Sequence, residues 1–138
     1  MSNVKNSEFQ FSNPELTDLT FHINDSFNMP DSVNVPQRLT ANMFADGDKS
    51  AIVKMTLRIG DETEEMPFYI EISMQSSFIW QDSIDFEKAK ALIQNNGVAM
   101  LISYARPIIA SITNSSRFPA YNLPFLDVRN FKNDEDDN

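Results

Sequence analysis

The chain of 138 residues contains no cysteine, one histidine and three glycines. Without cysteine it can form no disulfide, thiolate nucleophile or cysteine-based zinc site, and a reducing compartment, the cytoplasm, is the expected location. Three glycines leave few flexible loops of the kind that cradle phosphate groups. No apolar run reaches the roughly 18 residues of a membrane span, so we expect neither a signal peptide nor membrane insertion.

Basic residues are also few. The chain has 11 lysines and arginines against 20 aspartates and glutamates, a formal net charge of -9. Because binding to the phosphate backbone relies on a basic footprint, this balance argues against a nucleic-acid partner. What is abundant is phenylalanine, with 11 residues, and methionine, with 7. Such residues ordinarily pack a core, and display to a partner is the alternative use.

Reactive groups that converge on a catalytic site are hard to find. The only histidine, His22, falls on the polar side of a predicted strand, where a solvated role is expected. No serine stands in a nucleophile-elbow context. The acidic cluster of Asp61, Glu62, Glu64 and Glu65 lacks the residue layout of a calcium loop, so a solvated turn is the better interpretation. We therefore expect a non-enzyme with no catalytic residue, no metal site and no cofactor.

Apolar and polar residues alternate in the first 80 residues, and this pattern predicts strands. Leu19, Phe21 and Ile23 share one side of the first strand, and the residues expected to face inward from Ala51 to Ile59 are Ala51, Val53, Met55, Leu57 and Ile59. Residues 24–36, with two prolines and three asparagines, interrupt it as a long loop. A turn at Gly60-Asp61 predicts an antiparallel hairpin between the last two strands. The predicted strand regions are Phe9–Ile23 (crossed by Pro14), Arg38–Ala45, Ala51–Ile59 and Phe68–Met74, the last with a continuation through Phe78 and Trp80.

Helical signals begin after the strands. Asp82, Ser83 and Asp85 are competent helix N-caps, and a short helix is predicted from Phe86, with its end at Asn95-Asn96-Gly97. Apolar residues then repeat at helical spacing from Val98 to Ile112, with a kink expected at Pro107.

Residues 117–127 contain two prolines and predict an extended, packed tail. Strands followed by helices indicate an α+β fold. The predicted organisation is a disordered N-terminus (1–8), one domain (9–128) and an acidic disordered tail (129–138).

The second helix and the tail carry specific motifs. Tyr104-Ala105-Arg106 is followed by Phe118-Pro119 and then by Asn122-Leu123-Pro124. This succession resembles the signature of the SecB export chaperones, in which a Y-A-R helix leads into an F-P-x-L-N-L-x-P segment. The resemblance spans residues 9–128, and its upstream part consists of Phe9-Gln10, Asp18, Phe21, Gly60, Glu62 and Thr63.

This resemblance implies a four-stranded antiparallel sheet with helices on one face, assembled as a dimer of dimers. Members of the family hold unfolded polypeptides in the cytoplasm and pass secretory precursors to the SecA motor, without ATP or catalytic residues. A holdase favours adaptable apolar contacts over precise polar readout, and a strong negative charge keeps such a protein soluble.

The implied client-binding groove lies between helix and sheet, near the long loop. Phe27 and Met29 are the favoured candidates, because a loop gives fewer reasons to bury them. Ordinary core or tetramer packing is the alternative interpretation for every candidate. The full set is Phe27, Met29, Phe78, Trp80, Ile84 and Phe86.

The family's docking surface for SecA is acidic and lies on the outward side of the sheet. Asp18 and Glu71 occupy matching positions. His22 and Tyr69 depart from the family pattern, as do Pro107 and a final helix that is missing or reduced to Val128–Asn133. Two alternatives therefore accompany the export role: a chaperone dedicated to one client, such as the antitoxin of a toxin–antitoxin pair, and a structural or adaptor protein that reuses the fold.

Overall fold

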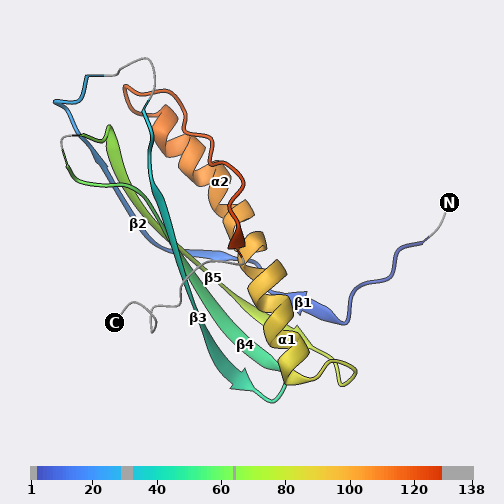
Figure 1. The fold of residues 1–138 in the computed structure, drawn as a ribbon. Helices are drawn as coiled ribbons and strands as arrows, with labels where there is room; N and C mark the ends of the chain where they lie inside the picture. The colour runs from blue at the N-terminus through green and yellow to red at the C-terminus, as the bar shows by residue number, and fades with distance from the viewer. Residues whose placement is uncertain (1–2, 29–32, 64, 129–138) are drawn as a thin grey trace.

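The structure, a computed structural model, describes residues 3–28, 33–63 and 65–128. Figure 1 shows a twisted sheet with the helical segment lying along one of its faces. Strands come first in the chain and helices after, as predicted for an α+β fold. The elements are β1 (Phe9–Phe11), β2 (Glu15–Ile23), β3 (Gln37–Gly47), β4 (Ser50–Gly60), β5 (Phe68–Trp80), α1 (Phe86–Leu92), the π-helical segment η1 (Ile93–Gly97) and α2 (Val98–Asn114).

The sheet is antiparallel, with the order β1-β5-β4-β3, and β2 also pairs with β5. β1 and β2 lie one after the other along the same edge of β5, so the five strands fill four strand positions. Pro14 separates them because its nitrogen carries no hydrogen for the ladder. The predicted four-stranded antiparallel sheet with helices on one face is confirmed, with its first strand split in two.

An irregularity in β2 between Leu16 and Asp18 changes which side chains face the helices. In an unbroken strand, residues three apart point to opposite faces of the sheet. Here Thr17 is the extra residue, and Leu16 and Leu19 both lie opposite inward-facing residues of β5. The alternation predicted from the sequence included Leu19 and missed Leu16.

The helix-facing side of β4 forms the centre of the core. Its alternation is as predicted, with polar or half-buried residues on the other side. Burial of a large aliphatic side chain contributes at most about 1.5–3 kcal/mol to stability. The five inward-facing residues of β4, each at most 1% exposed, are Ala51, Val53, Met55, Leu57 and Ile59.

The helical segment begins at one of the predicted caps. The Asp85 carboxylate accepts a hydrogen bond from the Lys88 backbone N–H at 2.8 Å. The prediction that Asn95-Asn96-Gly97 ends the first helix is wrong, because the chain continues through η1 directly into α2. Gly97 keeps right-handed helical angles and lies against the Phe78 ring. The absence of a side chain at Gly97 thus allows close packing against the sheet. The residue does not adopt the left-handed conformation with which glycine often ends a helix.

The segment after α2 returns along the helix without regular structure, as Figure 1 shows. α2 itself is continuous through Pro107. Phe118 and Leu123 are each 5% exposed, which confirms the predicted extended, packed tail. The predicted acidic tail and most of the predicted Val128–Asn133 remnant lie outside the described residues.

Candidate functional site

The face of the sheet away from α2 carries most of the polar side chains of the strands. The register places Asp18 of β2 beside Ser73 of β5, and Ser73 opposite Thr56 of β4. The Thr56 and Ser73 hydroxyl oxygens lie 2.8 Å apart and share a hydrogen bond. This face forms a shallow depression of about 500 Å³, lined by Asp18, Thr20, Asn42, Phe44, Lys54, Thr56, Arg58, Glu71 and Ser73.

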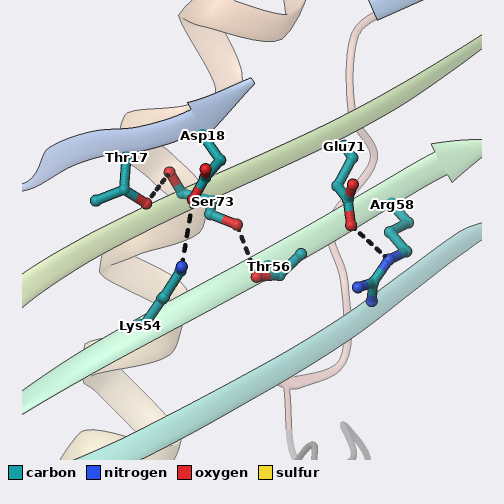
Figure 2. Close-up of polar contacts among 7 residues, drawn as sticks. All are labelled: Thr17, Asp18, Lys54, Thr56, Arg58, Glu71 and Ser73. Carbon is teal, nitrogen blue, oxygen red and sulfur yellow. Dashed lines mark hydrogen bonds and ion pairs between the residues drawn. The ribbon is translucent and has the colours of Figure 1, made fainter. Parts of the chain in front are cut away.

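Both predicted docking carboxylates are bonded to cations on this same face (Figure 2). Lys54 Nζ lies 3.2 Å from Asp18 Oδ2, and Arg58 Nε lies 2.9 Å from Glu71 Oε1. An exposed ion pair such as Lys54–Asp18 contributes only about 0–1 kcal/mol to stability, so a partner can replace Lys54 at little cost. The Arg58–Glu71 pair is about two-thirds buried and is less accessible to a partner. The charges of these four residues cancel, and they form no acidic patch by themselves.

Two exposed apolar side chains on this face were not among the predicted site residues. Phe44 is 56% exposed and Ile79 is 55% exposed. Phe44 lies opposite Ile52, which is half-buried. Both exposed residues occupy outward positions of alternating strands that otherwise carry mainly polar residues. That break in the polar side of the pattern is the sequence signal that could have identified them.

Three of the predicted client-binding residues belong to the core of the single chain. Phe78, Trp80 and Ile84 are 1%, 5% and 8% exposed. The Phe9 ring stacks on Phe78 with 5.6 Å between ring centroids, and on Trp80 with 6.4 Å. The alternative interpretation, core packing, describes their position in this fold, and a role in client binding stays a prediction.

The long loop does not leave Phe27 exposed, and that expectation is wrong. Phe27 is 8% exposed, and its ring lies 6.1 Å from that of Phe118. The Arg117 guanidinium donates to the Phe27 carbonyl at 2.7 Å and holds the backbone at this position. Met29 lies outside the described residues. Phe86, in the first turn of α1, is 45% exposed and is the exposed member of the described candidates.

A second apolar surface runs along the β1–β2 edge on the helix-facing side. Its members, which we call the edge strip, are Phe11, Leu16, Leu19 and Tyr104, with 41%, 44%, 38% and 44% of their surfaces exposed. The Phe11 and Tyr104 rings meet edge-on, with centroids 6.4 Å apart. The irregularity at Thr17 is what adds both leucines to this side. From the sequence, Tyr104 was identified only as part of the family motif, and the edge strip was not predicted.

The three residues of the Tyr-Ala-Arg motif of α2 make three different kinds of contact. Ala105 is fully buried against the sheet, while the tyrosine points outward into the edge strip. The Arg106 guanidinium donates to the backbone carbonyls of Leu123 and Pro124, the latter at 3.0 Å. The motif therefore packs α2 on the sheet and holds the tail on α2.

The β4–β5 turn carries the acidic residues that the sequence analysis assigned to a solvated turn. Hydrogen bonds from the Thr63 hydroxyl and backbone N–H lower the pKa of Asp61. His22 Nδ1 lies 2.9 Å from Glu62 Oε1, with both side chains about two-thirds exposed. Glu64 lies outside the described residues.

Within the part of the chain that the structure describes, no group of three or more histidine, aspartate or glutamate side chains is arranged to hold a metal ion. No helix in residues 3–28, 33–63 and 65–128 combines the length and apolarity needed to cross a bilayer.

The fold is shared with a known chaperone. The SecB-like chaperone Rv1957 of Mycobacterium tuberculosis, solved in complex with a ChAD peptide from the Rv1956 HigA1 antitoxin, matches with a TM-score of 0.66 and 15% identity, over 86% of this chain and 88% of that one. A protein of unknown function from Streptococcus agalactiae matches with a TM-score of 0.48 and 12% identity, over 85% and 97%. No family model and no curated protein matches the chain. The SecB-like fold predicted from the sequence motifs is confirmed.

Proposed function

We propose that this protein is a SecB-like chaperone, a holdase that binds unfolded polypeptides without ATP and without catalytic residues. The observation that carries the proposal is the edge strip, a set of large apolar side chains left exposed on a SecB-like fold. Exposed apolar residues that follow one edge indicate a binding surface more than scattered ones do. Apolar contacts also tolerate many client sequences. The net charge of -9 keeps such a surface soluble.

A chaperone dedicated to one client is the second candidate. The neighbour Rv1957 was solved with a peptide from an antitoxin. That complex favours a single polypeptide client, such as an antitoxin, over a broad set of precursors. A structural or adaptor protein that reuses the fold without binding clients is the remaining candidate from another class.

Export is a more specific form of the first proposal. Asp18 and Glu71 face outward on the sheet, where a SecA-type motor could reach them. A motor would have to replace Lys54 and Arg58 as their partners. Assembly as a dimer of dimers belongs to the same proposal, and a mass measurement in solution tests it.

An aggregation assay on matched variants tests the proposal. We expect excess protein to suppress aggregation of an unrelated unfolded precursor, and Leu16→Ser with Leu19→Ser to remove most of that suppression. Ile79→Ser is the control, because Ile79 is 55% exposed on the opposite face and undergoes the same change in polarity. Circular dichroism checks that each variant is folded.

The outcomes separate the candidates. Suppression by the Ile79 variant but not by the double variant supports the edge strip as the client surface. Failure to suppress any unrelated precursor, with binding to a polypeptide encoded by a neighbouring gene, favours the dedicated chaperone. If the protein binds no unfolded polypeptide at all, the structural or adaptor role is the candidate that remains.

A further inference from the structure

The outer edge of the sheet at β3 has a definite backbone pattern. The Gly60 N–H donates to the Pro36 carbonyl at 2.9 Å, which makes residues 36 and 60 a hydrogen-bonded pair. In an antiparallel ladder such pairs alternate with pairs that are not hydrogen-bonded. From the register it follows that the backbone groups of Arg38, Thr40 and Phe44 form hydrogen bonds with β4. The residues between them direct their N–H and C=O groups away from β4.

These outward-directed backbone groups belong to Leu39, Ala41 and Met43. β3 ends the strand order of the sheet, and among the described residues no backbone group pairs with this edge. Sheet edges are usually protected by lysine, proline or a bulge. From Gln37 to Ala45, β3 contains neither lysine nor proline, and its irregularity comes only after Ala45. Its one charged residue in this range is Arg38, near the start of the strand.

The opposite edge of the sheet differs in each of these respects. Pro14 separates β1 from β2, and an irregularity at Thr17 breaks the pairing of β2. Two carboxylates, Glu15 and Asp18, also flank that break. A long added strand would find an uninterrupted ladder only at β3.

We propose that the outer edge of β3 binds an extended segment of the client polypeptide as an additional strand. The inference rests on the proposed function and adds a second contact with the client, at the edge of the sheet opposite the edge strip. Unpaired backbone donors and acceptors at strand spacing are complementary to another extended backbone, whatever its sequence. An added strand would lie about 4.8 Å from β3, with alternate side chains beside Leu39 and Met43 on one face and Phe44 on the other. A client segment with apolar residues fits both sides.

Ala41→Pro tests the proposal, because proline removes an N–H that the ladder with β4 does not use. Ala41→Val is the matched control, since it adds the same two carbon atoms and keeps the N–H. The probe is a small disulfide protein, reduced and carboxymethylated so that it cannot refold. We expect Ala41→Pro to weaken binding of the probe about fivefold or more, and Ala41→Val to change it less than about twofold.

Amide hydrogen exchange on the unmodified protein keeps the proposal testable if the proline variant fails to fold. Saturating probe should slow exchange at Leu39, Ala41 and Met43 by about tenfold or more, and should affect Thr40 and Phe44 much less. Probe binding without this slowing overturns the edge inference and leaves the proposed function standing. No probe binding at all overturns both.

Protection of the edge amides before any probe is added also overturns the inference. Protection that is lost on dilution would assign the edge to a second copy of the chain. Protection that is independent of concentration would assign it to the chain itself.

Discussion

Gly97 and Phe78 lie so close together that a side chain on the glycine would touch the ring. A Cβ atom added at Gly97 would lie 3.0 Å from Phe78 Cζ and 3.1 Å from Cε1. Phe78 is 1% exposed, and its ring also stacks on the Phe9 ring. The helical segment can therefore approach the sheet at η1 only because residue 97 has no side chain.

Gly97→Ala should lower the free energy of unfolding. Overpacking of a core typically costs about 1–3 kcal/mol, and the better helix propensity of alanine returns about 1 kcal/mol. We expect a net loss of about 1 kcal/mol, measured by urea denaturation. Asn96→Ala, at an exposed position of the same segment, is the control and should be neutral or slightly stabilising. A more stable Gly97→Ala variant would show that the Phe78 ring moves aside freely.

Arg117 should be required to hold residues 24–27 at the start of the long loop. Its guanidinium donates to the carbonyls of Asn24, Asp25 and Phe27. Because Arg117 is itself exposed, we expect Arg117→Met to cost only about 1–2 kcal/mol, and to increase cleavage of the loop by a protease. Arg117→Lys keeps the charge but lacks the planar fork, so it should restore only part of the loss. Equal cleavage of Arg117→Met and the unmodified protein would refute this role.

Substitutions of Asp18 and of Lys54 should change the affinity for a SecA motor in opposite directions. Asp18→Lys should weaken binding to the cognate SecA motor by about tenfold, whereas Lys54→Met frees the Asp18 carboxylate and should strengthen binding about twofold to fivefold. Neither change should alter the free energy of unfolding by more than about 1 kcal/mol. Lys49→Met is the control, because Lys49 pairs with Asp82 at another place. Affinity that is the same in all three variants would count against docking at this face.

Asp61 should contribute to the acid sensitivity of the protein. The Thr63 hydrogen bonds hold the pKa of Asp61 below its ordinary value of 3.8. A carboxyl with a lowered pKa in the folded state stabilises that state at higher pH, and the contribution is lost as the pH falls below about 4 towards the folded-state pKa. The urea midpoint of Asp61→Asn should therefore fall less between about pH 5 and pH 2.5 than that of the unmodified protein.

Thr63→Val checks the cause of that effect. It removes the hydroxyl donor and leaves the backbone N–H, so its pH dependence should lie between those of the unmodified protein and Asp61→Asn. A decline in Asp61→Asn as steep as in the unmodified protein would assign the acid sensitivity to other groups.

The parts of the fold that follow a single period were predictable. β4 alternates strictly, and its five inward residues are buried as predicted. The Tyr-Ala-Arg motif carried the family resemblance, but it did not predict the contact of Arg106, which binds the Leu123 carbonyl of the tail. Leu16 was missed, because the extra residue in β2 changes the register and leaves no mark in the periodicity. The end of the first helix was placed wrongly, because a glycine in a sequence is typical of a helix end. Gly97 is instead required by the close contact of the helical segment with the Phe78 ring.

The candidate site was less predictable than the fold. Phe27 lies in a polar loop and Phe44 in a strand, yet the loop residue is 8% exposed and the strand residue 56%. The outward positions of Asp18 and Glu71 followed from the alternation, but their ion pairs with Lys54 and Arg58 depend on contacts between strands far apart in sequence.

The sequence by itself determined the net charge, the order of strands and helices, and the motifs that resemble the SecB family. These properties depend on composition and on local spacing. Only the tertiary structure decided which of the 11 phenylalanines are exposed and which carboxylates are paired. Exposure and pairing depend on register and packing between distant segments, and a shift of one residue turns a side chain to the other face of the sheet.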